Sequence, residues 1–462
     1  MRLKKMALMA AICCSAAGGT LSAQEMNNGY VSQVSYCDCG MDECGCDAVP
    51  MSDGCGCGES SCGGGCNSGC GDTCSDDSCC DGGGIFSDGF GCNLGEPISL
   101  LGDCCGYSAG GWVQLGYHNR NLQLFNSRKH DLQLQQAWVY AEKAIDTSNG
   151  FDLGGRVDYL YGTDGPDTQA FGIANGHWDN QWDNGSDYGH ALPQVYGEAG
   201  YGDFSVKFGH FYTLIGYEVV AAPDNFFYSH AYTMYNSEPF THTGAVATYN
   251  MTEDIDIFGG YVMGWDSGFE DNGDAVLAGG SVQLTDDINF TSTLVAGRFN
   301  DANANRVLDG GAIGGIENGF MQSNVANVQL TDDTSYIFQT DILDTEDADG
   351  ATVRKTFGIN QYLIKQLSDC FGLGARFEWW NVDSASQGFY GNNVPVMQGD
   401  FDVFALTLGT NLRPHANLIF RPEIRWDWVD GNRADLSAAG IELLEDNASR
   451  QTTFGIDTII TF

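Results

Sequence analysis

From residue 109 to the C-terminus, apolar and polar residues alternate in segments with the length a tilted strand needs to cross a bilayer, about 9–12 residues. A period of two places apolar side chains on one face of a β-strand and polar side chains on the other. In one such segment Leu418, Phe420, Ile424 and Trp426 oppose Arg421 and other polar residues. The pattern predicts sixteen strands, at 109–117, 131–143, 150–161, 192–200, 203–212, 240–250, 254–265, 274–285, 288–298, 322–331, 334–343, 353–365, 370–380, 400–413, 416–427 and 451–462.

The connections between these strands alternate in length. The connections after even-numbered strands are brief, and those after odd-numbered strands are mostly long, for example 162–191, 213–239 and 428–450. Membrane barrels have short periplasmic turns and longer external loops. In lipid an open sheet edge would leave amides unbonded, so the sheet has to close. The predicted fold is all-β, a closed antiparallel transmembrane β-barrel of about 16 strands at 109–462.

The first 23 residues predict a signal peptide. Arg2, Lys4 and Lys5 form a basic start, 6–17 form a short apolar core, and Leu21-Ser22-Ala23 suits a signal peptidase. The apolar core is too short to span a bilayer. No later run approaches about 18 apolar residues, so no transmembrane helix is expected.

Residues 24–108 differ sharply from the barrel region. They contain 15 of the 18 cysteines and 14 Asp or Glu, with no Lys or Arg, in a background of Gly and Ser. With few large apolar residues this acidic Cys/Gly-rich segment cannot form a core of its own. We predict a periplasmic arm, largely disordered or disulfide-linked, because exported chains meet an oxidising compartment. Soft-metal binding by Cys-x-Cys pairs is the alternative. Fifteen is odd, so one arm thiol pairs with Cys370, pairs with another chain, or stays free.

Composition and charge narrow the function. A net charge of -41 argues against nucleic acid as a partner, since a polyanion would be repelled. The 63 Gly, 9 Pro and 12% aromatics suit many strands joined by tight turns. No HExxH or Gly-x-Ser-x-Gly motif is present, and His230 and His242 are better explained as polar loop residues than as metal ligands. We therefore expect no enzyme activity, no catalytic residues, no cofactor and no metal site.

The last strand carries a local signal. Phe454, Ile456, Ile460 and the terminal Phe462 alternate with smaller or polar residues, and the strand resembles the one that bacterial outer-membrane proteins present to the barrel-assembly machinery. Aromatic residues at strand ends also suit the girdles at the two membrane surfaces. These are Tyr159, Tyr161, Trp265, Trp379, Trp380, Trp426 and Trp428.

A segment in the middle of the chain resembles a known family. The runs Leu214–Glu218, Asn225–His230 and Glu238–Gly244 are similar to those of the β-barrel porin-2 family of bacterial outer-membrane proteins, and the resemblance extends more loosely over 109–462. It implies a barrel with pore activity in the cell outer membrane, and assembly as a homotrimer. It does not cover the cysteine-rich arm.

The same segment is the third long loop, and in sixteen-stranded porins that loop folds inward and narrows the channel. By this analogy Glu218, Asp224 and Glu238 would face the lumen. Opposite them we expect basic residues of the polar strand faces, namely Arg156, Lys207, Arg376, Arg421 and Arg425. Opposed charges in a narrow pore would orient polar solutes by a transverse field. The alternative is that these charges form ordinary salt bridges that brace the wall.

The sequence therefore predicts an outer-membrane porin that allows passive diffusion of small hydrophilic solutes. Its expected partners are outer-membrane lipid, the barrel-assembly machinery, the solutes and further copies of the chain. A structural cell-envelope protein, crosslinked to envelope partners through disulfides of the arm, is the alternative. A barrel enzyme such as a surface lipase ranks last, because no Ser-His pair is identifiable.

Overall fold

The computed structural model describes residues 94–99, 106–301, 306–308, 311–313, 316–385, 401–431, 444–445 and 448–462. The predicted signal peptide 1–23 lies outside these residues, and so does the predicted arm apart from 94–99 and 106–108. Within the described ranges, no helix combines the length and the apolar character that crossing a membrane would require.

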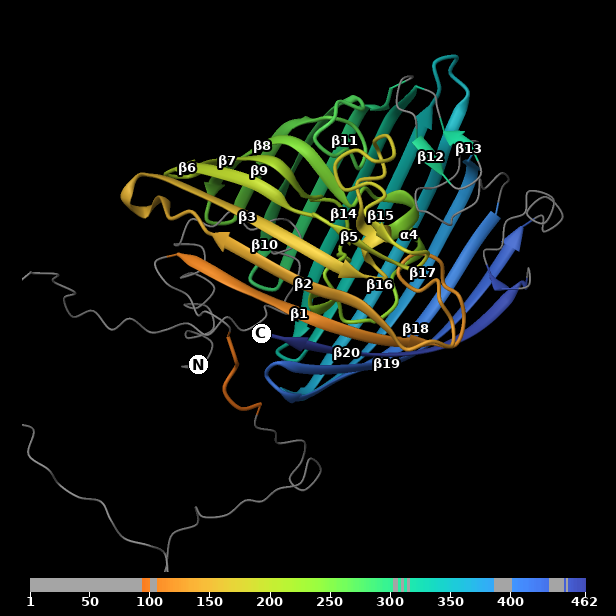
Figure 1. Cartoon of the computed structure of the whole chain (residues 1–462). Coiled ribbons are helices and arrows are strands. Elements are labelled where there is room, and N and C mark those ends of the chain that lie inside the picture. The colour runs from red at the N-terminus through yellow and green to blue at the C-terminus, as the bar shows by residue number, and fades with distance from the viewer. Residues whose placement is uncertain are drawn as a thin grey trace, which may run out of the picture.

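Sixteen of the described strands form one antiparallel wall that closes on itself (Figure 1). Closure is direct, because β1 pairs with β2 on one side and with β20 on the other. The wall strands are β1 Tyr107–His118, β2 Gln133–Lys143, β3 Phe151–Gly162, β6 Val195–Tyr201, β7 Phe204–Tyr212, β8 Thr241–Thr252, β9 Ile255–Val262, β10 Asp274–Thr285, β11 Ile288–Asn300, β14 Glu317–Thr331, β15 Thr334–Glu346, β16 Thr352–Ser368, β17 Phe371–Ala385, β18 Phe401–His415, β19 Leu418–Gly431 and β20 Arg450–Thr461. The predicted closed barrel and its strand number are confirmed.

Side chains alternate between the two faces of the wall, as a period of two requires. In β19, Arg421, Glu423 and Arg425 are buried inside the barrel, whereas Phe420 and Ile424, which alternate with them, keep part of their exposure. The outer face is apolar over most strands, and its exposed residues include Val139, Leu153, Phe208, Ile257, Val276, Leu373, Leu408 and Phe454. This face suits lipid, and the polar face turns inward.

The last residues complete the barrel. The backbone of Phe462 exchanges two hydrogen bonds of 2.9 Å with Gly111, so the chain end is paired to β1. Phe454 and Ile460 point outward with 47% and 45% of their surface exposed. A side chain at Gly111 would collide with the carbonyl of Trp138 and the ring of Phe462, so glycine allows this close approach.

The connections follow the predicted rhythm with one exception. The short turns join β6 to β7, β8 to β9, β10 to β11, β14 to β15, β16 to β17 and β18 to β19. The connection 347–351 between β15 and β16 was expected to be longer but is itself short, because both strands extend further than the alternation indicates. Longer connections carry extra elements: α3 Gly165–Thr168, β4 Asp183–Asn184 and β5 Tyr188–Ala191 between β3 and β6, and the hairpin of β12 Arg306–Leu308 and β13 Gly311–Ile313. A short 3-10 turn, η1 Thr147–Asn149, joins β2 to β3.

The prediction of aromatic girdles holds for only some residues. On the outer face, the ring of Phe404 stacks on Trp379 at 6.4 Å and on Trp428 at 5.6 Å. Trp265 and Trp380, in contrast, are buried inside the barrel at 2% and 0% exposure, so the girdle prediction is wrong for them. Trp265 lies just beyond β9, which ends at Val262, and Trp380 lies within β17, so their predicted places at strand ends did not show which way they face.

Residues 94–99 lie against the turn between β18 and β19. The Ile98 N–H donates to the Asn417 side-chain oxygen at 2.6 Å, and the Asn417 amide nitrogen donates to the Ile98 carbonyl at 2.9 Å. The Ala416 N–H donates to the Leu94 carbonyl at 2.9 Å. In the neighbouring short turn Cys370 is disulfide-bonded, and every other cysteine of the chain lies outside the described residues.

Candidate functional site: an inward-folded loop

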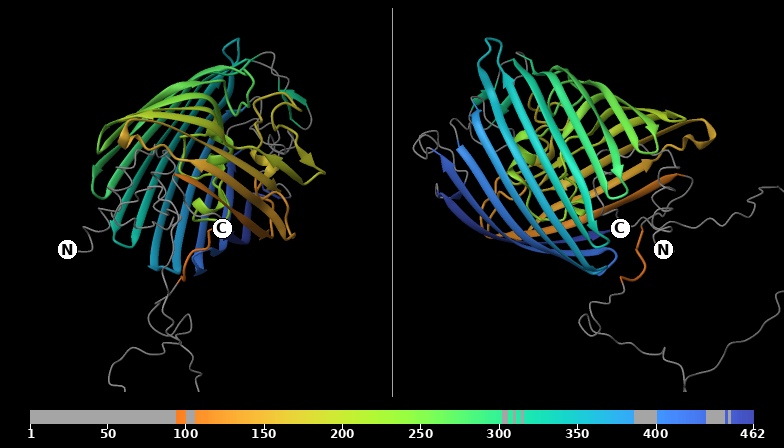
Figure 2. Two further views of the ribbon diagram at one scale, coloured as in Figure 1. Left: turned by 60° about the vertical axis from the view of Figure 1, so that its left-hand side comes forward. Right: turned by 180° about the vertical axis from the view of Figure 1, so that it is seen from behind.

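The segment 213–240 between β7 and β8 leaves the wall and lies inside the ring of strands, as both sets of views show (Figures 1 and 2). It contains the short elements η2 Ala222–Asp224 and α4 Tyr232–Ser237, and all six residues of α4 are buried. We call this segment the inner loop. Gly216 has a φ of +85°, and a side chain there would collide with the Glu238 carboxylate, so the loop needs glycine at this position.

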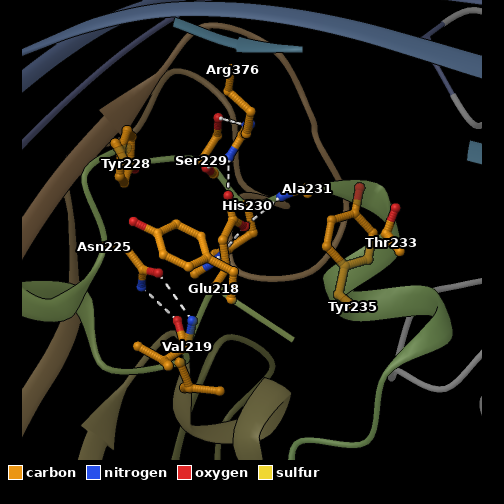
Figure 3. A network of polar contacts seen from close by, with 12 residues as sticks. Glu218, Val219, Asn225, Tyr228, Ser229, His230, Ala231, Thr233, Tyr235 and Arg376 are labelled. Atoms are coloured by element: carbon orange, nitrogen blue, oxygen red, sulfur yellow. Dashed lines mark hydrogen bonds and ion pairs between the residues drawn. The ribbon is translucent and has the colours of Figure 1, made fainter. Parts of the chain in front are cut away.

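One buried ion pair fixes the inner loop to the wall. Nη1 of Arg376 on β17 lies 2.5 Å from Oε1 of Glu218, and it also donates to the Ser229 carbonyl at 2.5 Å (Figure 3). The other Glu218 oxygen accepts the Ala231 N–H at 2.8 Å, and the Tyr362 hydroxyl donates to Oε1 at 3.1 Å. This carboxylate therefore links two parts of the loop to two strands of the wall.

Carboxylates of the wall accept the inner loop's backbone N–H groups. Glu378 on β17 accepts the Tyr232 and Thr233 N–H groups at 2.8 and 2.7 Å. Glu423 on β19 accepts the Tyr228 and Ser229 N–H groups at 3.0 and 3.2 Å. Such charge-assisted hydrogen bonds are about twice as strong as neutral ones. Sequence reasoning missed Glu378 and Glu423, because a polar residue at an inward position does not reveal that its partner is a loop backbone.

Guanidinium groups of the same wall bind the inner loop's carbonyls. Arg421 Nη1 donates to the Ala222 and Asn225 carbonyls at 2.7 and 2.6 Å. Arg425 Nη1 donates to the His230 carbonyl at 2.6 Å. Each of these arginines also pairs with a wall carboxylate: Arg421 with Asp457 at 2.5 Å and Arg425 with Asp427 at 2.6 Å. Their charges are thus neutralised within the wall, and their remaining N–H groups hold the loop.

Only one of the three predicted acidic loop residues keeps access to water. Asp224 is half-buried, whereas Glu218 and Glu238 are 5% and 6% exposed. Glu238 accepts the Gln339 amide at 2.7 Å from β15. Glu218 thus forms an ion pair with Arg376, of the kind that the bracing alternative describes, whereas Glu238 bonds a neutral amide.

Two of the five predicted basic residues lie apart from the inner loop's anchors. Arg156 on β3 pairs with Glu142 at 3.1 Å and Asp158 at 2.6 Å, and its side chain is 18% exposed. Its guanidinium carbon lies 4.4 Å from the centre of the Tyr140 ring. Lys207 on β7 is half-buried, with its ammonium 4.4 Å from the centre of the Tyr196 ring.

These residues lie on the strands β2, β3, β6 and β7, while the strongest loop anchors are on β17 and β19. The inner loop also reaches β2, where the Gln136 side chain donates to the Val220 carbonyl at 2.8 Å and accepts the Ala222 N–H at 3.1 Å. Arg156 and Lys207 are half-buried on β3 and β7. Arg156 pairs there with Asp158, and the ring of Tyr212 at the end of β7 stacks on Trp138 with centres 6.2 Å apart. Opposite charges are thus brought to one region of the interior.

Further loops cover the inner loop at the long-loop end. In 119–132, Phe125 packs against His230 and Phe240 with ring centres 4.9 and 5.5 Å apart. The Phe125 N–H donates to Asp167 in the next long loop at 2.8 Å. Burial raises the pKa of Asp167 to about 6 and the pKa of Asp164 to about 7. Phe125 therefore packs onto the inner loop and also binds the neighbouring long loop at Asp167.

A metal centre finds no support in this part of the molecule. Among the residues that the structure describes, no group of three or more His, Cys, Asp or Glu is arranged to hold a metal ion. Of the two histidines considered from sequence, His242 has its Nε2 2.9 Å from the Thr213 hydroxyl. His230, in the inner loop, has its Nδ1 3.4 Å from the Glu218 carboxylate.

The family model described as "Putative beta-barrel porin-2, OmpL-like" matches residues 106–462. Among solved structures, Salmonella typhi OmpF in complex with daunomycin is similar at a TM-score of 0.51 and 13% identity, over 77% of this chain and 97% of that one. A loop-deletion mutant of Vibrio cholerae OmpT matches at a TM-score of 0.49 and 13% identity, over 77% of this chain and 99% of that one. The anion-selective porin from Comamonas acidovorans matches at a TM-score of 0.48 and 9% identity, over 77% of this chain and 99% of that one. No curated protein sequence matches the chain.

Proposed function

Because the chain belongs to the β-barrel porin-2, OmpL-like family, whose barrels lie in the outer membrane, we propose that small hydrophilic solutes diffuse passively through it. The barrel supplies the membrane-spanning wall, and the inner loop narrows its interior. No chemical step and no cofactor are needed for this function.

The observation that carries the proposal is the inner loop held inside a closed barrel, together with inward charges that keep part of their exposure. The inner loop is bound to the β17 and β19 side through Glu218, Glu378 and Glu423, and these contacts are buried. The inward charges Arg156 and Lys207, on β3 and β7, keep part of their exposure. Pore diameter and the charged side chains that line a pore set which solutes pass, and the inner loop and these inward charges would supply both.

Liposome swelling tests passive diffusion. Purified full-length protein in liposomes should admit arabinose faster than glucose and glucose faster than a trisaccharide, because the constriction selects by size. Liposomes without protein are the control. Absence of swelling with every sugar, in vesicles shown to contain folded barrel, would contradict the proposal.

Reversal potentials in asymmetric KCl test which charges line the path. Lys207→Gln should shift selectivity toward cations and Asp224→Asn toward anions, since each removes one charge from the solute path. Lys365→Gln is the matched control, because Lys365 is exposed near a short turn and pairs with Asp333 at 2.8 Å. If all three variants behave alike, Lys207 and Asp224 do not line the path.

A second candidate, the structural cell-envelope protein, is favoured by the attachment of residues 94–99 to the β18–β19 turn and by the disulfide at Cys370. The hydrogen bonds fasten residues 94–99 to the barrel at its short-turn end, and disulfides of the arm would crosslink the protein to envelope partners. Envelope fractions on non-reducing gels should then show multimers that disappear on reduction. Monomers under both conditions would remove this candidate and leave the channel proposal intact.

The remaining partners stay predictions. The homotrimer follows from the family resemblance, the barrel-assembly machinery from the terminal strand β20, and outer-membrane lipid from the apolar outer face. The trimer is tested by the mass of the protein–detergent complex.

A further inference from the structure

A row of polar side chains crosses the outer face of the wall. Ser292 on β11, Asn324 on β14 and Thr340 on β15 are direct neighbours in the strand register. The Ser292 hydroxyl donates to the Asn324 side-chain oxygen at 2.8 Å, and the Asn324 amide nitrogen donates to the Thr340 hydroxyl at 3.4 Å. Gln322 on β14 and Gln361 on β16 flank the row. We call these five residues the outer polar patch.

The next residues along each strand prove which way the patch faces. Thr293 donates to the carbonyl of Leu214 in the inner loop, and Gln339 donates to Glu238 of the same loop. Val325 packs in the interior with Tyr217 of the inner loop. Because successive side chains of a strand point to opposite faces, Ser292, Asn324 and Thr340 point outward.

The patch lies within the apolar band and not at its rim. On the same outer face, Leu294, Phe320 and Ile342 lie on the side toward the long loops, with 37%, 37% and 36% of their surface exposed. Phe290 and Leu330 lie on the side toward the short turns, and Leu330 is 54% exposed. Polar groups at this depth would meet hydrocarbon, where hydrogen-bonding capacity that is left unused carries a cost in free energy.

The patch leaves complementary capacity unused. The Gln361 side-chain oxygen accepts the Tyr336 hydroxyl at 2.9 Å, while no described residue accepts from its amide nitrogen. The Gln322 nitrogen makes only long hydrogen bonds of 3.4 and 3.5 Å, and no described residue donates to its oxygen. The patch therefore presents one open donor and one open acceptor about two strands apart.

We propose that the outer polar patch is the contact through which a second copy of this chain packs against the barrel, with a symmetry axis close to Asn324. Near a rotation axis identical patches meet, so a contact must be self-complementary. Amides satisfy this condition, because each carries both a donor and an acceptor. Gln322 of one copy can then bond Gln361 of the next, and lipid is excluded from both. This inference does not depend on solute diffusion.

Replacement of the amides tests the contact. In Gln322→Leu/Asn324→Leu the full-length protein in detergent should lose its oligomer, with dissociation at a concentration at least 10-fold higher than wild type, measured by light scattering. Thr410→Leu is the matched control, since Thr410 is a half-buried residue of β18 on the outer face, between the exposed Leu408 and Leu412. Heat-modifiable migration on gels shows whether each barrel is folded.

Photo-crosslinking keeps the proposal testable if the leucine variant fails to fold. With Gln322→p-benzoylphenylalanine, irradiation of membranes should give a species of twice the chain mass, whereas Ile424→p-benzoylphenylalanine on β19 should not. A monomeric wild type, an oligomer unchanged by the leucines, or crosslinks only to lipid or to a different protein would each overturn the proposal.

Discussion

The buried pair between Arg376 and Glu218 gives the sharpest prediction about the inner loop. In Arg376→Met the side chain keeps similar apolar bulk but loses four contacts: those to Glu218, the Ser229 carbonyl, the Ser229 hydroxyl and the Thr407 hydroxyl. Glu218 is then a buried carboxylate without its cation.

The size of the effect follows from that uncompensated charge. Removing one partner of a buried ion pair costs about 3–5 kcal/mol. Because 1.4 kcal/mol corresponds to a factor of ten, the equilibrium constant for local opening of the inner loop should rise by roughly two to three and a half powers of ten. The barrel itself should stay folded, since the wall hydrogen bonds of β17 with β16 and β18 are untouched.

Hydrogen exchange of the protein in detergent measures local opening directly. The Ala231 amide, which donates to Glu218, should lose protection by that factor, and single-channel currents should become noisier. Arg354→Met is the matched control, because Arg354 is equally buried and pairs with Glu317 at 2.7 Å between two wall strands. It should leave the Ala231 amide protected.

The double variant Arg376→Met/Glu218→Gln isolates the charge. The neutral amide at position 218 costs less to bury than an unpaired carboxylate. Protection of the Ala231 amide against hydrogen exchange should therefore be higher in the double variant than in Arg376→Met. Equal protection of Ala231 in wild type and Arg376→Met would refute the claim that this pair holds the loop.

Three further predictions concern the mouth, the chain end and the arm. Burial raises the carboxyl pKa of Asp164 to about 7 and of Asp167 to about 6. The packed loops therefore keep these carboxyl groups protonated at pH values where open loops would release the protons. The stability of the packed loops is greatest at low pH and falls as the pH rises through 6 to 7. Hydrogen exchange of 163–170, corrected for intrinsic rate, should speed up between pH 5 and pH 8, and Asp164→Asn/Asp167→Asn should abolish that difference. Deletion of Phe462 removes two backbone hydrogen bonds to Gly111 and the terminal aromatic side chain. The amount of heat-modifiable, folded barrel in outer-membrane fractions should therefore fall severalfold, whereas Phe269→Ala in a long loop should leave that amount unchanged. Asn417→Ala removes the side-chain bonds to Ile98, and proteolysis near 94–99 should accelerate; unchanged cleavage would show that these bonds do not hold the segment.

The alternation of side chains was sufficient to predict the wall. Period-two patterning depends only on which residues tolerate lipid, and lipid is the same solvent for every strand, so β19 and β20 could be placed within a few residues. The face of Trp265 and of Trp380 could not be predicted in this way, because tryptophan suits both a membrane surface and a packed interior. The Trp380 indole in fact donates to Ser237 of the inner loop at 3.0 Å.

The site was predictable in location but not in detail. The family-like run at 213–244 pointed to the inner loop, and the choice of Glu218 and Arg376 brought together two residues that do pair. Arg421 and Arg425 were expected to face the loop's acids, yet they bind its carbonyls and take their anions from Asp457 and Asp427. Partner choice depends on loop geometry in three dimensions, which charge and spacing along the chain do not contain.

The most direct test of the whole account is a planar-bilayer recording of the purified, folded full-length protein. A closed wall with the inner loop held firmly inside it predicts discrete, long-lived current steps of uniform size in symmetric KCl. A bilayer that contains folded barrel and yet carries no steps would contradict the claim that this structure is an open channel.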